Sequence, residues 1–257
     1  MLKEETKFAD NDIFEGMSSI SAVIKAIERG ISNRRIRYIY VDSSKKKSKA
    51  KEISFLKAKS TELGFELLFA DEEYISSRTV GNTHGGIIAE CTPRDIPILC
   101  DASIRPNGLY FLLEGIEDPY NFGNAVRSVY ASGADGMIVG ERNWLGVSGT
   151  VARASAGTSE LLPSYVSDTV DAITLFRNAG YKIICAGIRD SESIFEADLS
   201  KPILVILGGE KRGISTNVLK LADKIVRIDY GTEFRGSLSA SASAAVFAFE
   251  ILRYNKK

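Results

Sequence analysis

The sequence predicts an α/β protein of two units, and three observations lead to this prediction. From residue 107 onward, apolar strands alternate with helical patterns, which favours a largely parallel sheet. The residues before 97 form a shorter series of strands and helices. Between these parts, residues 92–107 contain three of the chain's six prolines, as is typical of a linker. We therefore expect units at residues 1–96 and 107–257, joined by a linker at 97–106.

The first unit is expected to be a small α/β domain. Ser18 or Ser19 can cap a helix that has an apolar face and ends near Gly30. A second helix is expected over residues 53–63, where Gly64 ends it. Strands are expected at residues 36–41, 65–70 and 87–89.

The second unit alternates strands and helices more regularly. Strands are expected at residues 109–113, 136–139, 181–186, 203–207 and 224–228. Helices are expected at residues 124–132, 169–179, 217–222 and 239–254. The sequence therefore predicts a sheet with several helical crossovers, which is typical of a parallel arrangement.

Composition argues against several classes of protein and of site. Hydrophobic residues make up 44% of the chain and charged residues 26%, as in globular proteins that are soluble. No apolar run approaches the roughly 20 residues of a membrane-spanning helix, and the N-terminus does not resemble a signal peptide. We therefore expect a cytoplasmic protein with no membrane partner. Three cysteines without a CxxC pair, together with the single histidine His84, argue against a disulfide framework and a metal site.

Positive charge is concentrated in one part of a chain whose net charge is zero. Between Arg34 and Lys59, ten Lys or Arg residues stand against two acids, Asp42 and Glu52. Such a run is either a solvated surface or a patch that contacts nucleic-acid phosphates, because clustered Lys and Arg supply the electrostatic part of that affinity. The run alone does not decide between these interpretations.

The segment after the strand at 109–113 is the first of three that suggest a binding site. Asp118 and Pro119 favour a turn, since proline fixes its own φ and restricts the residue before it. This turn brings Asn121 and Arg127 to the carboxyl end of a strand, where open α/β sheets bind ligands. An ordinary loop is the alternative for the segment taken alone.

Two glycine-rich segments follow other predicted strands. At 203–215 the strand ends in Gly208 and Gly209, but Ile214 stands where a P-loop needs lysine. Glu210 likewise replaces the second glycine of a dinucleotide fingerprint. The third segment, residues 228–245, joins a strand end to a Gly- and Ser-rich loop and then to a helix that begins with small residues. Each segment alone fits either a structural turn or a binding loop.

In this order the three segments resemble the motifs of the SpoU/TrmH-type RNA 2′-O-ribose methyltransferases of the SPOUT superfamily. Their three motifs are matched by Asp118, Pro119, Asn121, Gly123 and Arg127; by Gly208, Glu210 and Gly213; and by Ile228, Ser237, Leu238 and Ser241. The resemblance covers about residues 107–255. The first unit, with its His84–Gly86 lead-in to a strand, resembles the ribosomal-protein-like RNA-binding domain of many members.

The resemblance implies a SPOUT domain with a deep trefoil knot, a homodimer, and S-adenosylmethionine as cofactor with no metal. It implies that the catalytic residues are Arg127, Asn121, Glu210, Ser237 and Ser239. It implies that the cofactor lies against Ala186, Gly187, Leu207, Gly208, Gly209, Ile228, Ser237 and Leu238. The substrate would be RNA, with ribosomal RNA favoured over transfer RNA because appended N-terminal domains are frequent among the enzymes that act on ribosomal RNA.

The chain departs from the family pattern at two places. Residues 228–230 read Ile-Asp-Tyr where the family has Ile-Pro-Met, and Ser239 stands where the motif has asparagine. Serine can still donate or accept one hydrogen bond, though with a shorter reach. We therefore expect a variant active site, and the alternative is a non-catalytic RNA-binding protein that retains the knotted fold.

Overall fold

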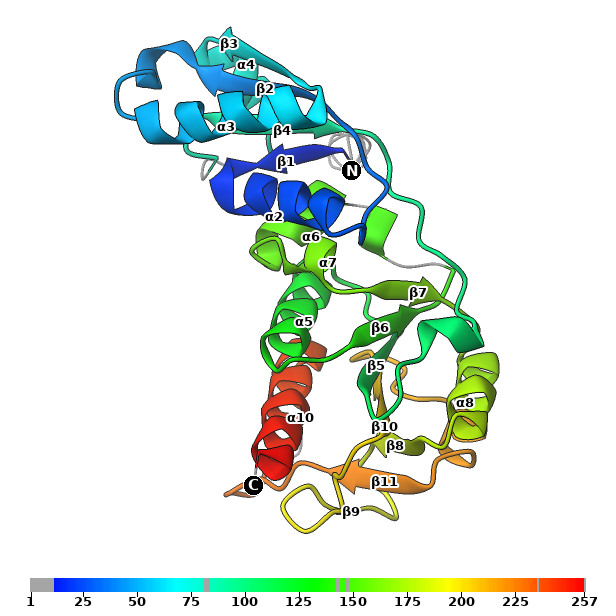
Figure 1. Cartoon of the computed structure of the whole chain (residues 1–257). Helices are drawn as coiled ribbons and strands as arrows, with labels where there is room; N and C mark the ends of the chain where they lie inside the picture. Colours follow the sequence, from blue (N-terminus) through cyan, green and yellow to red (C-terminus); the bar gives the residue numbers. More distant parts are fainter. Residues whose placement is uncertain (1–11, 81–83, 142–143, 147, 235, 257) are drawn as a thin grey trace. The chain divides into compact units, whose positions relative to one another are not determined.

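The computed structural model describes residues 12–80, 84–141, 144–146, 148–234 and 236–256 (Figure 1). The chain divides into two compact units: residues 1–95 together with 144–161, and residues 96–143 together with 162–257. Residues 144–161 thus group with the first unit, although they lie between two strands of the second. The division differs in this segment from the contiguous one expected from the sequence.

The first unit contains a four-stranded mixed sheet. Its strands lie in the order β1 (Ile13–Glu15), β4 (Ile87–Cys91), β2 (Ile36–Asp42) and β3 (Glu66–Ala70). β2 and β3 are parallel, whereas β4 is antiparallel to both of its neighbours. The three strands expected in this unit are present, and the three-residue β1 joins them.

The helices of the first unit are α2 (Gly16–Glu28), α3 (Ala50–Leu63) and the short α4 (Glu72–Ser77). Apolar side chains of α2 and α3 share a core with β2 and β4. α3 ends as expected at Gly64, which has a φ of 77°. The expected cap of α2 is wrong: Glu15 occupies the N-cap position, and both serines lie within the helix.

The segment 144–161 forms η3 (Trp144–Gly146), α6 (Ser148–Ala154) and α7 (Thr158–Leu161). α6 packs against β1, and α7 packs against α2. A Cβ on Gly149 would lie 2.2 Å from the carbonyl oxygen of Ile13, and one on Gly157 would lie 2.5 Å from Ala22 Cβ. Glycine is therefore required at both positions for this close packing.

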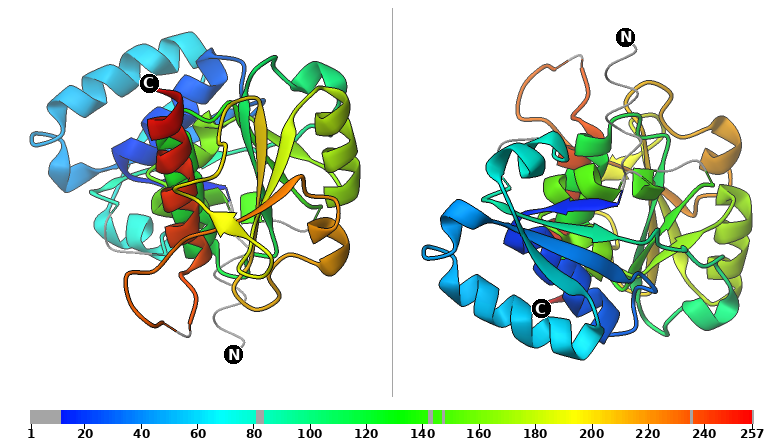
Figure 2. Two further views of the ribbon diagram at one scale, coloured as in Figure 1. Left: turned by 90° about the horizontal axis from the view of Figure 1, so that it is seen from below. Right: turned by 90° about the horizontal axis from the view of Figure 1, so that it is seen from above.

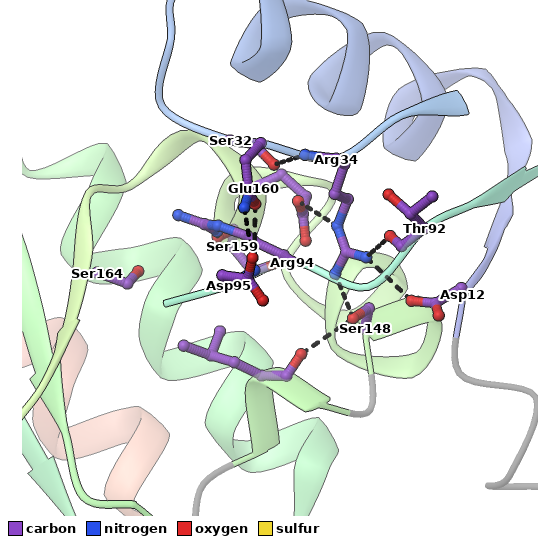
Figure 3. Close-up of polar contacts among 12 residues, drawn as sticks. Asp12, Ser32, Arg34, Thr92, Arg94, Asp95, Ser148, Ser159, Glu160 and Ser164 are labelled. Carbon is purple, nitrogen blue, oxygen red and sulfur yellow. Dashed lines mark hydrogen bonds and ion pairs between the residues drawn. The ribbon is translucent and has the colours of Figure 1, made fainter. Parts of the chain in front are cut away.

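A buried arginine ties this segment to the rest of the first unit (Figure 3). Arg34 Nε lies 3.0 Å from Glu160 Oε2, and Arg34 Nη1 lies 2.9 Å from Asp12 Oδ1. The same guanidinium donates to Ser148 Oγ and to the carbonyl of Thr92. Arg34 is only 2% exposed, so it does not belong to the solvent-facing part of the lysine- and arginine-rich run. A buried charge without partners is costly, so these contacts stabilise the packing of residues 144–161 against the rest of the first unit.

The second unit contains a seven-stranded sheet. The strand order is β7 (Ser164–Val166), β6 (Gly136–Val139), β5 (Leu109–Glu114), β10 (Ile203–Gly208), β8 (Lys182–Ala186), β11 (Lys224–Arg227) and β9 (Glu192–Ser193). All neighbouring pairs are parallel, as the sequence predicts. The five expected strands are present, together with the short β7 and β9. The carboxyl ends of β5, β10, β8 and β11 consequently meet at one edge of the sheet.

Helices cover both faces of this sheet (Figures 1 and 2). α5 (Pro119–Ala131) and α10 (Ala240–Asn255) pack together on one face, and α8 (Thr169–Asn178) covers the other. The unit also contains the short α9 (Thr216–Leu219) and η2 (Asp101–Ser103). Under α8, the rings of Phe176 and Tyr110 lie 4.9 Å apart in the core. Within the described residues, no helix has the length and apolar character needed to cross a membrane.

Candidate active site

The start of α5 places the first of the three sequence segments. Asp118 is the N-cap, and its side chain accepts a 2.7 Å hydrogen bond from the backbone N–H of Asn121. Pro119 is the first helical residue, where its missing N–H costs no hydrogen bond. The helix therefore begins five residues before the expected Asn124. Asn121 and Arg127 consequently lie on one helix rather than on a loop and a helix.

Polar contacts join the three segments at the end of β10. Asn121 Nδ2 donates to Glu210 Oε1 over 3.1 Å, and the backbone N–H of Ala240 donates to the same oxygen over 3.0 Å. Ser241 Oγ donates to Asn121 Oδ1 over 3.1 Å. The carboxylate of Glu210 thus holds the start of α5 against the start of α10. Residues from 121, 210 and 240–241 form one hydrogen-bonded group.

Ser239 has a structural role at the start of α10. Its Oγ accepts a 3.2 Å hydrogen bond from the backbone N–H of Ala242, which makes Ser239 the N-cap of the helix. The same hydroxyl lies 3.0 Å from Ser241 Oγ. Both contacts involve the hydroxyl of a residue that the family resemblance placed among the catalytic groups. In this conformation the side chain of Ser239 serves the helix start.

Arg127 stands apart from this group. It lies six residues after Asn121 on α5 and is exposed. Its guanidinium makes no hydrogen bond or ion pair with any residue that the structure describes. The arginine is therefore available to a ligand or to a second protein chain. The structure shows no hydrogen bond or ion pair between Arg127 and Glu210.

A cavity of about 340 Å³ opens at the carboxyl ends of β8, β10 and β11. Its lining includes all eight residues that the family resemblance assigned to the cofactor: Ala186, Gly187, Leu207, Gly208, Gly209, Ile228, Ser237 and Leu238. Glu210 also lines it, so the cavity adjoins the polar group described above. Most of the wall is apolar, and charged side chains such as Glu210, Arg189 and Arg227 add polar groups, a combination that is typical of small-molecule sites.

The glycines of β10 serve the packing of the chain itself. A Cβ on Gly208 would lie 2.4 Å from the carbonyl carbon of Gly213, and a Cβ on Gly209 would lie 1.8 Å from the carbonyl oxygen of Gly115. Gly213 has a φ of 60°, which favours glycine. These contacts explain the glycine-rich sequence without a ligand.

Arg189 and Tyr230 are among the cavity-lining residues that sequence reasoning missed. The hydroxyl of Tyr230 accepts a 3.3 Å hydrogen bond from the backbone N–H of Leu238, and its ring lies 5.4 Å from that of Phe234. Tyr230 stands where the family motif has methionine, so this departure from the motif could have indicated that Tyr230 belongs to the site. Arg189 lies outside the three motifs and gave no signal.

A carboxyl group at the end of β5, that of Glu114, is partly buried. Burial raises the pKa of Glu114, while a hydrogen bond with Thr169 acts in the opposite direction. Glu114 Oε2 has no hydrogen-bond partner. The group does not line the cavity. Glu114 therefore belongs to the α8 side of the sheet and not to the candidate site.

The family model for the SpoU rRNA Methylase family matches residues 108–249, which is more than half of the chain. The chain belongs to the SpoU rRNA Methylase family. The match begins one residue before β5 and ends within α10, so it contains all three motifs and every residue lining the cavity. The family assignment therefore agrees with the resemblance that the three sequence segments carry.

Two curated relatives and one solved structure show the extent of the similarity. A putative TrmH family tRNA/rRNA methyltransferase of Staphylococcus saprophyticus is 32% identical over 143 residues, which is 55% of this chain and 57% of the relative. The 23S rRNA (guanosine-2′-O-)-methyltransferase RlmB of Ralstonia nicotianae is 27% identical over 225 residues, covering 86% of this chain and 88% of the relative.

Among solved structures, the AdoMet-bound rRNA methyltransferase of Sinorhizobium meliloti superposes with a TM-score of 0.76 at 22% identity. The superposition covers 98% of this chain and 89% of the other. At this identity the likeness shows the fold, which this SpoU family chain therefore shares over nearly its whole length.

Proposed function

We propose that this chain is an S-adenosylmethionine-dependent methyltransferase that methylates a ribose 2′-hydroxyl of RNA. The observation that carries the proposal is the cavity at the ends of β8, β10 and β11, beside the group formed by Asn121, Glu210 and Ser241. The family assignment supports the reaction class. The relative named as a 23S rRNA 2′-O-methyltransferase, aligned over 86% of this chain, favours ribosomal RNA over transfer RNA. Such a substrate implies action in the cytoplasm.

The residues around the cavity fit the proposed cofactor. Its volume of about 340 Å³ lies within the range of roughly 300–1,000 Å³ found for small-molecule sites. Backbone groups at Leu207–Gly209 and Ile228 would hold the adenosine part, and Ser237 and Leu238 would close over it. When bound, S-adenosylmethionine supplies a methyl group on a sulfonium, an electrophile that needs no metal activation.

The chain's own residues would orient the ribose and stabilise its charge. A fixed geometry of the two reactants can supply about 7–11 kcal/mol of the barrier reduction. Glu210 fixes Asn121 and the start of α10, and the Ser237 hydroxyl lines the cavity beside them. Arg127 would stabilise the developing alkoxide as a cation, because guanidinium stays protonated in proteins.

We further propose a homodimer and a knotted second unit. Arg127 is exposed and separate from Glu210, so a partner protomer would complete the site that one chain leaves open. Phe249 on α10 is 49% exposed and supports an interface along α5 and α10. The strand order β5-β10-β8-β11, in which the chain returns to the middle of the sheet, is compatible with the trefoil knot.

Calorimetry with S-adenosylmethionine and with its demethylated product tests the cofactor. We expect micromolar binding of at least one of them without added metal. Absence of binding to both would contradict the enzyme and favour the alternative, an RNA-binding protein that retains the fold. Mapping ribose methylations in cellular RNA with and without the gene would then identify the substrate nucleotide.

Arg127→Ala tests the proposed chemistry separately from binding. We expect methyl transfer to fall by on the order of 10²–10³-fold, as for other groups that stabilise transition-state charge, with cofactor affinity within a few-fold of the parent. Arg105→Ala, another exposed arginine of the second unit, is the matched control and should retain activity. Parental activity in Arg127→Ala would refute this role.

A further inference from the structure

A second cavity lies within the first unit, at the start of α2. Its volume is about 360 Å³. It is lined by Glu15, Gly16, Met17, Ser18, Ser19, Lys49, His84, Gly85, Ile87, Arg153 and Ala156. The lining therefore combines a helix N-terminus with two cations and a histidine. Its residues come from α2, from the turn before α3, from the lead-in to β4 and from α6.

The N-terminus of α2 presents unused hydrogen-bond donors to this cavity. The helix is 13 residues long, its N-cap Glu15 makes no side-chain capping bond, and its first turn contains no acid. The first N–H groups of a helix have no partner within the helix. Those of Gly16, Met17 and Ser18 meet no acceptor among the described residues. Together with the helix dipole, such donors favour an anion.

A buried histidine points independently to a ligand. His84 is 6% exposed and lines the cavity. Its Nδ1 accepts a 3.1 Å hydrogen bond from the backbone N–H of Gly86, so the ring proton is on Nε2. That second nitrogen has no partner among the described residues. The donor is not among the sealed atoms that lack a partner, so it faces the cavity and can donate to a ligand bound there.

Two cations complete the lining. Lys49 Nζ lies 3.0 Å from Glu52 and remains partly exposed. Arg153 Nη1 lies 3.2 Å from Glu15 Oε2, while Glu15 Oε1 accepts from the backbone N–H of Val80. Glu15, the carboxylate among the described lining residues, therefore already has its own donors. It does not remove the attraction that the cation of Lys49 and the helix end exert on an anion.

The position of Arg153 depends on the segment 144–161. α6 carries this arginine, and the Arg34 cluster anchors both the start of α6, through Ser148, and the end of α7, through Glu160 (Figure 3). The close approach of Gly157 to α2 fixes the segment next to the cavity. The cavity is thus assembled from sequence on both sides of β5 and β6. Neither the first 95 residues nor the interposed segment forms it alone.

We infer that this cavity binds a phosphate group of the RNA substrate's backbone, an inference that rests on the proposed function. Phosphate matches the lining because its oxygens are acceptors only, whereas the backbone N–H groups, His84 Nε2 and the Lys49 ammonium are donors. A bound phosphate would fix the register of the RNA on the first unit without reading its sequence.

Ser18→Asp provides the sharpest test. Its carboxylate, in the first turn of α2, would occupy the anion's place and also stabilise the helix. We expect a melting temperature equal to or above the parent's, together with a loss of RNA affinity of about fivefold or more and a log–log salt slope lower by about 0.7–0.9. Ser18→Asn, which is neutral and of similar size, is the matched control and should bind RNA like the parent. Equal RNA affinity in Ser18→Asp would overturn the inference.

Titration with inorganic phosphate distinguishes a cavity that binds an RNA phosphate from one that binds only a free anion. In the full chain, we expect phosphate to shift the amide NMR signals of Gly16, Met17 and Ser18, and an RNA oligonucleotide to shift the same signals. Shifts with phosphate alone, with RNA affinity unchanged by Ser18→Asp, would overturn the assignment to RNA. Shifts with neither probe would overturn the site itself.

Substitutions of the histidine add a second line of evidence. His84→Gln can keep a donor near the position of Nε2 and should retain most of the RNA affinity, whereas His84→Leu should lose it. Arg29→Gln, at the other end of α2, removes an exposed cation outside the cavity and is the control. Cofactor affinity should stay unchanged in all of these variants. A parent that binds no cofactor would refute the proposed function, while the RNA and phosphate measurements would still decide this site.

Discussion

At the scale of single residues, Ser239 makes a contact that the sequence did not predict. The resemblance placed this side chain among the catalytic groups, whereas the structure shows it capping α10 through Ala242. The position of Ser239 is compatible with both roles, because α10 begins at the edge of the cavity. A residue there can cap the helix and also lie close to a bound ligand. Sequence spacing identified the position but did not reveal which partner the hydroxyl takes.

Ser239→Asn tests the departure from the family motif. Asparagine caps a helix about as well as serine, so we expect the melting temperature to be unchanged. If the position supports the reacting hydroxyl, the added amide should raise the methylation rate by on the order of tenfold, less than the 10²–10³-fold that one oriented donor contributes in a preorganised site. Single-turnover rates at saturating RNA measure this. A clear fall in rate would mean that serine belongs to a distinct site geometry.

The raised pKa of Glu114 predicts that the stability of the protein depends on pH. Burial raises its folded-state pKa above the ordinary 4.5, so the unfolded chain loses this proton first as pH rises. Stability from this group is therefore present below pH 4.5 and is lost as pH rises through the folded pKa. Glu114→Gln should stabilise the protein at pH 7 and reduce the fall in melting temperature between pH 4.5 and pH 7. A variant that is less stable than the parent at pH 7 would contradict this assignment.

At the scale of elements, the sequence predicted the regular strands well and the short ones poorly. β6 has the expected bounds, and β5 and β10 each extend one residue beyond theirs, because buried parallel strands are continuous apolar runs. β1, β7 and β9 have two or three residues and carry no such pattern. α5 begins earlier than expected because proline favours the first turn of a helix as well as a turn in a loop.

The positively charged run divides into two groups in the structure. Arg34 is buried, and the members that lie within 4.0 Å of acids are Arg37, Lys45, Lys49 and Lys59. The exposed members without an acidic partner in the described part of the chain are Arg35, Lys46, Lys47, Lys51 and Lys57. Lys46 Nζ lies 4.1 Å from the centre of the Phe69 ring, which is 41% exposed. The second group is therefore the part of the run whose charge is not balanced by a neighbouring acid among the described residues.

Lys47→Gln combined with Lys51→Gln tests this surface. If both contact RNA, affinity should fall and the log–log salt slope should decrease by about 0.7–0.9 per lost contact. Lys25→Gln combined with Arg29→Gln removes the same charge from the exposed side of α2 and should have little effect. Fluorescence anisotropy across a salt series gives both quantities. Unchanged values in the first variant would mean that the run is a solvated surface.

At the scale of the whole molecule, the sequence could not show where residues 144–161 belong. Their helices are seven and four residues long, and their packing against β1 and α2 depends on residues more than 100 positions away. Their sequence position, between the first and second motifs, placed them in the unit expected at residues 107–257. The partners of a short helix follow from tertiary contacts, and periodicity carries no information on them.

Removal of the first 95 residues should therefore damage more than RNA binding. A shortened chain of residues 96–257 would keep 144–161 without its packing partners, exposing Val151 and Ala152, which are fully buried in the whole protein. We expect this chain to aggregate or to unfold without a cooperative transition. A second chain that also replaces 144–161 by a short Gly/Ser linker should fold better, because it removes the whole of the first unit. Differential scanning calorimetry compares the two, and a higher melting temperature in the chain that retains 144–161 would show that this segment belongs with the second unit.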